Sequence, residues 1–256
     1  MNRLTIMVAV MLMTAPAASV WAQSPSAPAP ADRMNTAALL NAQLAIAYLK
    51  QGDVGLAQKK IDKALTQNAH ESLVQLGAGL VYERLEQTDK AGRYYETALK
   101  LDPHNPDMQN TYGGFQCRHG HAVEGQKLFE QAAKNPAFQT PEVAYTNAGV
   151  CARGANDLPR AEAFFRQALL MKADFPDALV QLADVTFTRG QGLAARALIE
   201  RYLRASPATP ETLLLASRVE RSLADTAAAA KYEAQLRHDF PESNSVRELT
   251  NSAPVP

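Results

Sequence analysis

Two cysteines and two nearby histidines are the residues of this sequence whose types and spacing could support chemistry. Cys117, His119 and His121 lie close together, and Cys151 follows Cys117 by 34 positions. Cysteine and histidine side chains bind zinc, and two cysteines can instead form a disulfide. Because the chain has no C-x-x-C pair, redox catalysis is not expected. Which of the remaining outcomes applies depends on the elements that carry these residues.

No motif typical of an enzyme accompanies them. The patterns H-E-x-x-H, G-x-S-x-G and G-x-x-x-x-G-K-[ST] are all absent from the sequence. Carboxylates such as Asp102 and Asp107 flank prolines, where we expect them to cap helices. The sequence therefore predicts a protein that is not an enzyme and that needs no cofactor.

The composition favours a folded, helical protein of neutral charge. The 256 residues include 26 Lys and Arg against 26 Asp and Glu, which gives no formal net charge. A nucleic-acid or acidic-lipid binder would show a basic excess, so neither partner is expected. With 46% apolar and 20% charged residues, the chain can bury a core. Few aromatic residues and many alanines favour helices over strands.

A period of 34 residues organises the chain between its two ends. Ala57 and Ala91 lie 34 positions apart, and each is followed seven positions later by another alanine, Ala64 or Ala98. Tetratricopeptide repeats have this period: small residues let two antiparallel helices approach closely, and a proline ends the second helix. The spacing predicts an all-α fold, a tetratricopeptide-repeat α-solenoid of about six helical hairpins. The clearest unit contains Gly79, Tyr82, Ala91, Tyr95, Ala98 and Pro103.

Residues 1–22 are typical of a secretory signal peptide. Arg3 is their only charge, the apolar run from Leu4 to Met13 is too short to span a membrane, and Val20 and Ala22 suit the site of cleavage. We expect residues 23–34 to form a Pro/Ala/Ser-rich tether, residues 35–250 the solenoid and residues 251–256 a flexible tail. No other stretch is long and apolar enough to span a membrane. The protein is therefore expected to be exported to the periplasm.

The repeat register indicates whether the cysteines form a disulfide and whether the histidines bind a metal. Cys117 falls late in the first helix of the third unit, and Cys151 falls at nearly the same height in the first helix of the fourth. First helices of neighbouring units pack side by side, so a disulfide is feasible if the Cα atoms come within about 4.4–6.8 Å. Two buried free thiols are the alternative, but an oxidising compartment favours the disulfide. Gly120 places His119 and His121 in a solvated turn, so no metal site is expected.

First helices line the concave face of such a solenoid, and their register predicts a groove with an apolar N-terminal end. The same register carries polar residues in later units, among them Asn110, Arg153 and Asp184. Contiguous exposed apolar surface marks a partner site. The alternative is that residues 34–40 or the tether fold over this surface and cover it. The predicted partner-binding residues are Leu39, Ile46, Leu49, Leu73, Leu76 and Leu80.

The third and fourth units also resemble a known family, the type IV pilus biogenesis and stability proteins (the PilF/PilW pilotins). The family motif N-x-Y-G-x-F-x-C matches residues 110–117, N-x-G-x-C matches residues 147–151, and N-P-x-(F/Y)-x-(T/S)-P matches residues 135–141. The likeness extends over residues 36–243. It implies a six-repeat, outer-membrane-associated factor that helps the pilus secretin to insert or assemble, with Cys117 and Cys151 as the family's bridge.

One feature departs from the family pattern. Members of the family are usually lipoproteins with a cysteine at the signal cleavage site, whereas this sequence has no cysteine before Cys117. We therefore expect either a soluble periplasmic factor or one that reaches the inner face of the outer membrane through its partner.

The resulting hypothesis is a scaffold for type IV pilus biogenesis. It would bind the pilus secretin and promote the outer-membrane localisation or multimer assembly of that protein. The alternative is a general cell-envelope assembly scaffold that binds other periplasmic proteins through the same groove.

Overall fold

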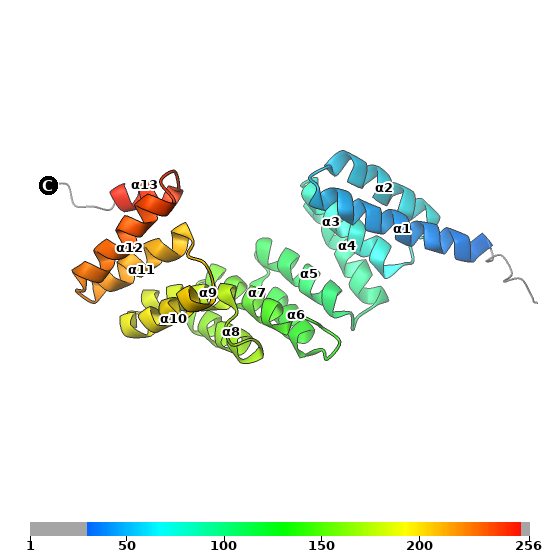
Figure 1. Cartoon of the computed structure of the whole chain (residues 1–256). Helices are drawn as coiled ribbons and strands as arrows, with labels where there is room; N and C mark the ends of the chain where they lie inside the picture. Colours follow the sequence, from blue (N-terminus) through cyan, green and yellow to red (C-terminus); the bar gives the residue numbers. More distant parts are fainter. Residues whose placement is uncertain (1–29, 252–256) are drawn as a thin grey trace, which may run out of the picture.

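Helices make up the protein throughout the part that the structure, a computed structural model, describes, which is residues 30–251 (Figure 1). No strand occurs within that range. The helices are α1 (Pro30–Lys50), α2 (Val54–Gln67), α3 (Ser72–Arg84), α4 (Thr88–Leu101), α5 (Pro106–Arg118), α6 (Ala122–Lys134), α7 (Pro141–Gly154), α8 (Leu158–Met171), α9 (Pro176–Thr188), α10 (Gly192–Ala205), α11 (Pro210–Ser222), α12 (Thr226–Asp239) and α13 (Asn244–Asn251).

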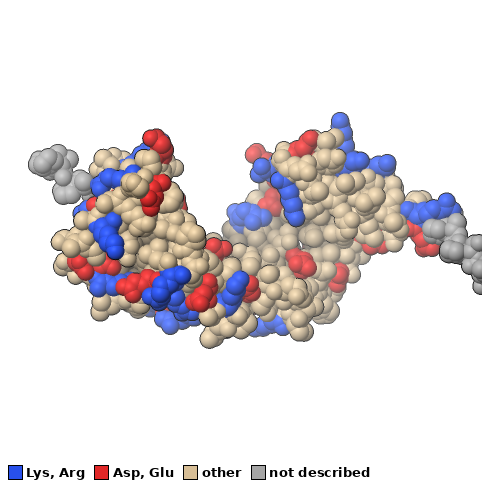
Figure 2. Space-filling model, viewed as in Figure 1, with Lys and Arg blue, Asp and Glu red and all other residues tan. Residues whose placement is uncertain are grey.

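Consecutive helices pack as antiparallel pairs, α1 with α2 through α11 with α12, and the pairs stack into an arc (Figure 1). The predicted all-α solenoid of about six hairpins is thereby confirmed. The last helix, α13, packs against α11 and α12 and closes the C-terminal end of the stack. The space-filling view shows the arc open between the N-terminal hairpins and α11–α13 (Figure 2).

The boundaries of the helices follow from residues at their starts. Proline occupies the first turn of α5, α7, α9 and α11, where its missing N–H has no intrahelical partner to lose. Three of the second helices begin after an aspartate, Asp53, Asp157 or Asp225, whose carboxylate accepts a hydrogen bond from a backbone N–H three residues on. Proline starts and aspartate caps therefore set the repeat boundaries.

Glycine at one repeat position lets the two helices of a hairpin touch. A Cβ atom on Gly79 would lie 2.6 Å from the ring of Tyr95, and one on Gly149 would lie 2.5 Å from the ring of Phe165. Both rings are buried. The small residue in the first helix and the bulky residue in the second are thus complementary parts of one contact.

The two ends of the solenoid differ from the sequence-based expectation. Helix α1 begins at Pro30, so the prediction of an extended tether is wrong for residues 30–34. Proline suits the first turn of a helix, and Asp32 in that turn is favoured by the helix dipole. The predicted signal peptide, the rest of the tether and residues 252–256 lie outside the described residues. Within residues 30–251, no helix combines the length and apolar character needed to cross a membrane.

Candidate functional site

The predicted apolar groove lies on α1 and α3, and its residues are more covered than the sequence suggested. Leu49, Leu73 and Leu80 are partly buried and pack against the core of the first two units. Leu39 and Ile46 on α1 are also only partly buried. Side chains of intermediate exposure therefore line this surface.

Leu76 differs from the other five. It is only 9% exposed and belongs to the core itself. Because α3 packs against α1, α2 and α4, the middle of α3 is covered by its neighbours. The prediction that Leu76 faces a partner is therefore wrong, and its removal leaves five residues in the candidate groove.

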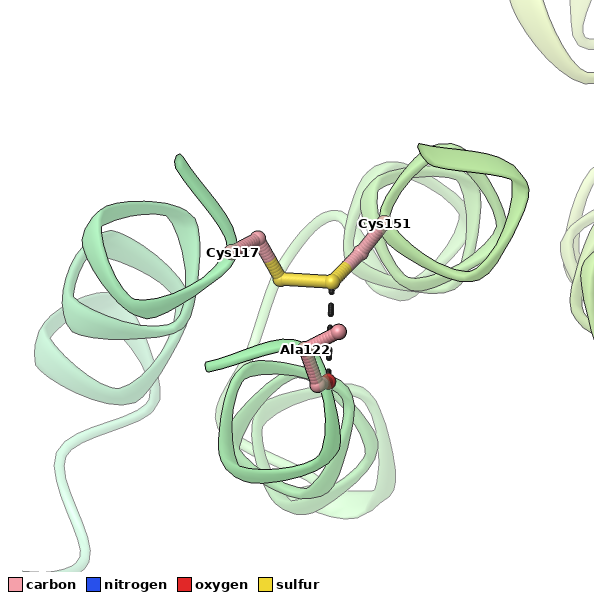
Figure 3. The surroundings of a disulfide bond; sticks show 3 residues. All are labelled: Cys117, Ala122 and Cys151. Atoms are coloured by element: carbon pink, nitrogen blue, oxygen red, sulfur yellow. Dashed lines mark hydrogen bonds between the residues drawn. A yellow bond between two sulfur atoms is a disulfide. The ribbon is translucent and has the colours of Figure 1, made fainter. Parts of the chain in front are cut away.

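The two cysteines form a disulfide between α5 and α7 (Figure 3). Their Cα atoms are 5.6 Å apart, within the range that a disulfide needs. Figure 3 shows the bridge lying above the start of α6, where the Cys151 sulfur lies 3.6 Å from the carbonyl oxygen of Ala122. A disulfide sulfur carries no hydrogen to donate, so this is a packing contact. The bridge joins the first helices of the third and fourth units and leaves neither cysteine free as a metal ligand.

The two histidines have separate structural positions beside the bridge. The ring of His119 lies 4.4 Å from that of Phe115, between centroids. His121 precedes α6 as its N-cap residue. Both histidines are exposed. The structure therefore places them at the turn between α5 and α6, as the register predicted.

An aromatic and ionic cluster connects the second unit to the third. The Tyr95 hydroxyl donates to Glu83 Oε2 at 2.7 Å, and Arg118 Nη2 lies 2.7 Å from Glu83 Oε1. The Tyr95 ring also lies 5.0 Å from the ring of Phe115, between centroids. Burial raises the pKa of Tyr95 above its ordinary range, and the hydrogen bond to Glu83 raises that pKa further. Sequence reasoning found Tyr95 as a packing residue but missed its carboxylate partner.

Ion pairs occupy the later part of the concave register. Arg153 on α7 pairs with Asp184 on α9 at 2.6 Å, and Arg218 on α11 pairs with Glu248 on α13 at 2.5 Å. Arg153 and Asp184, which the sequence placed in the polar part of the groove, are thus paired with each other. Each of the two ion pairs connects two different helices.

The stacked hairpins define the class of the protein, a tetratricopeptide-repeat solenoid. A tetratricopeptide-repeat family model matches residues 43–106. The type IV pilus assembly protein PilF of Pseudomonas aeruginosa is 22% identical over 207 residues, which cover 81% of this chain and 82% of PilF. An uncharacterized protein of Haemophilus influenzae is 31% identical over 123 residues, which cover 48% of this chain and 69% of that protein.

A solved structure agrees with these sequence relatives. The crystal structure of PilW, a widely conserved type IV pilus biogenesis factor, matches with a TM-score of 0.74 and 29% identity, over 83% of this chain and 98% of PilW. The chain belongs to the tetratricopeptide-repeat proteins, and over most of its length it is related to the PilF/PilW type IV pilus assembly proteins. The resemblance found in the sequence motifs is confirmed.

Proposed function

We propose that this protein is an exported, non-catalytic scaffold for type IV pilus biogenesis that binds the pilus secretin. The observation that carries the proposal is the match to the structure of PilW, which covers 83% of this chain and 98% of that one. The relationship to PilF over 81% of the chain supports the same process. We place the protein in the periplasm, at the inner face of the outer membrane when bound to its partner.

The binding surface in this proposal is the partly buried face of α1 and α3. Leu39, Ile46, Leu49, Leu73 and Leu80 present apolar side chains that further burial would stabilise. An apolar segment of a secretin subunit would cover them, which would keep that segment from aggregating before the ring assembles. The surface needs no large rearrangement, because α1 and α3 are already packed against each other.

The test replaces Leu39 and Ile46 by glutamate, since neither side chain belongs to the buried core. The matched control is Leu170→Glu on α8, a leucine that is 72% exposed and lies away from α1 and α3. We expect the double variant to lose secretin capture in a pull-down with purified secretin subunits, while Leu170→Glu captures it normally. Circular dichroism verifies that both variants remain helical.

Normal secretin capture by the folded double variant would contradict the assignment of the surface. The process is tested separately with a deletion strain. Loss of secretin multimers and of twitching motility supports the proposed function. Normal pili together with other envelope defects would instead indicate a general cell-envelope scaffold.

A further inference from the structure

The outer face of the solenoid has a different charge from the inner face. Helices α5, α7 and α9 contact one another in turn, whereas α6, α8 and α10 lie on the outer side of the arc (Figure 1). These three outer helices carry seven Lys and Arg against four Asp and Glu, and the three inner helices carry two against four. Figure 2 shows Lys and Arg side chains along the lower, outer rim of the arc. The neutral total charge, which argued against an acidic-lipid partner, is thus an average over unequal faces.

Apolar side chains are exposed at one repeat position of this outer face. The second residue of α6 is Val123, that of α8 is Pro159 and that of α10 is Leu193. Val123 is 65% exposed and Leu193 is 70% exposed, and Pro159 is exposed as well. The corresponding residues of α2 and α4 are Gly55 and Asp89. The three outer helices therefore present a row of apolar side chains that the first two units lack.

Basic side chains surround the first member of this row. Residues along one side of α6 and Arg160 of α8 line a hollow of about 370 Å³ that includes Val123, Lys127 and Lys134. Among the described residues of the lining, Glu130 is the only acid, and its carboxylate lies 2.9 Å from Lys134 Nζ and 3.9 Å from Arg160 Nη2. Lys127 forms no ion pair with any residue that the structure describes. Three cations therefore face one carboxylate, which leaves two positive charges in excess.

A phospholipid bilayer offers groups that match both features. Its anionic phosphates bind ammonium and guanidinium groups, and a guanidinium can donate two parallel hydrogen bonds to one phosphate. The boundary between headgroups and acyl chains accepts apolar side chains that protrude from a protein. A soluble anion would neutralise the cations but would leave Val123 and Leu193 in water. The apolar row and the basic hollow together therefore favour a membrane surface as the partner.

We infer that the outer face of α6, α8 and α10 docks on the surface of an anionic phospholipid bilayer. Val123 and Leu193 enter the headgroup layer. The hollow binds lipid phosphates through Lys127, Lys134 and Arg160. Such contacts are individually weak and reversible, and they require no lipidated cysteine. In this orientation the inner face of the solenoid, which carries the surface assigned to the secretin, stays open to the periplasm.

The test is co-sedimentation of the exported protein with vesicles of phosphatidylethanolamine and phosphatidylglycerol, compared with vesicles of phosphatidylcholine alone. We expect binding to the anionic vesicles only, and weaker binding in about 1 M NaCl, where the screening length falls to about 3 Å. Lys127→Gln/Arg160→Gln should weaken binding by about tenfold or more. The matched control is Lys59→Gln/Lys63→Gln on α2, which removes the same charge from two exposed side chains and should bind normally.

Tryptophan fluorescence measures whether the apolar row enters the bilayer. Leu193→Trp should show a blue-shifted emission maximum with anionic vesicles and quenching by brominated lipids, because the indole moves from water into the headgroup layer. The control is Leu40→Trp on α1, a leucine that is 56% exposed and lies outside the docking face. Its emission should not change. The sequence has a single tryptophan, Trp21, so the wild type gives the background.

Several results would overturn the inference. Equal binding to charged and neutral vesicles is one, and equal emission changes in the two tryptophan variants are another. Equal losses in the two glutamine variants would show that binding follows net charge and not this face. Binding of soluble glycerophosphoglycerol as tight as that of the vesicles would show that the hollow takes a free anion. The assay contains no secretin, so its result is independent of the proposed function, and thermal melts verify that all variants are folded.

Discussion

The two halves of the solenoid use different side chains at the same repeat positions. In the second unit, the Tyr95 hydroxyl on α4 binds Glu83 on α3, 12 residues earlier. In the sixth unit, Glu233 on α12 binds Arg221 on α11, also 12 residues earlier. The first pair joins a neutral hydroxyl to a carboxylate, and the second joins two opposite charges. Equivalent helix contacts are thus stabilised by chemistries that respond differently to salt and pH.

A second repeat position shows the same difference. The Tyr82 hydroxyl on α3 donates to Asp62 on α2 at 2.6 Å. The corresponding residue of the last unit, Glu220 on α11, pairs with Arg196 on α10. Both contacts connect a first helix to the second helix of the preceding unit. The N-terminal half therefore depends on buried tyrosines and the C-terminal half on partly buried ion pairs.

The disulfide joins these two halves, and its loss should have the largest effect. Cys117 and Cys151 close a loop with a sequence separation of 34. On the chain-entropy model such a loop stabilises the fold by roughly 3–4 kcal/mol. We expect the free energy of unfolding of the Cys117→Ala/Cys151→Ala variant to be lower by this amount, as measured by denaturant unfolding. Reductant should destabilise the wild type equally and leave the variant unchanged. Identical unfolding of the wild type with and without reductant would contradict the bridge.

Glycine packing should matter about equally in both halves. Gly79→Ala and Gly149→Ala each push a Cβ into a buried ring, that of Tyr95 or Phe165. Overpacking of this kind costs about 1–3 kcal/mol. Urea unfolding measures both variants, and Gly154→Ala is the matched control, because its added methyl group meets no atom within 4 Å. A loss of stability in only one of the two halves would show that the repeat position is not equivalent.

Removing the Tyr95 hydroxyl measures what its hydrogen bond to Glu83 contributes to stability. Tyr95→Phe keeps the ring but leaves Glu83 without its hydrogen bond from Tyr95, which should cost about 1–2 kcal/mol. The control is Tyr94→Phe, since the neighbouring Tyr94 hydroxyl makes no hydrogen bond among the described residues. The measurement is the free energy of unfolding in urea. Equal losses in the two variants would indicate that the bond to Glu83 contributes nothing.

Alkaline pH should reduce the contribution of Tyr95 to the free energy of unfolding. Burial raises the pKa of Tyr95 above its ordinary value of 10.0. Its contribution is therefore complete below pH 10 and declines above it, where the unfolded chain ionises and the folded protein does not. For Tyr95 alone the loss at pH 10.5 is roughly 0.8 kcal/mol. The stability difference between the wild type and Tyr95→Phe should shrink by this amount from pH 9 to pH 10.5. A constant difference would contradict the raised pKa.

The sequence predicted the helical repeats better than the side-chain contacts between their helices. Glycine, alanine and proline have to occupy fixed positions in a hairpin, so their 34-residue spacing revealed the fold and brought Cys117 level with Cys151. Leu76 was misplaced because its burial depends on how closely α3 packs against the neighbouring helices. The Tyr95–Glu83 bond and the hydrogen bond from Asn147 to Asn110 were missed because each joins residues of different helices. Such pairings depend on side-chain direction, which the period alone does not contain.

The smallest expected difference between the two halves is in how salt changes the stability lost on mutation. Arg221→Gln removes one partner of Glu233, which is only 7% exposed, but Arg237 lies within 3.9 Å of the same carboxylate and remains. Because Arg221 itself is largely exposed to solvent, we expect a loss below about 1 kcal/mol in dilute buffer. This loss should shrink in about 1 M NaCl, where the screening length falls to about 3 Å. The loss in Tyr95→Phe should stay constant, since a neutral donor is not screened in the same way. Thermal melts of both variants at the two salt concentrations measure this contrast, and an equal salt response would show that the two contacts do not differ in kind.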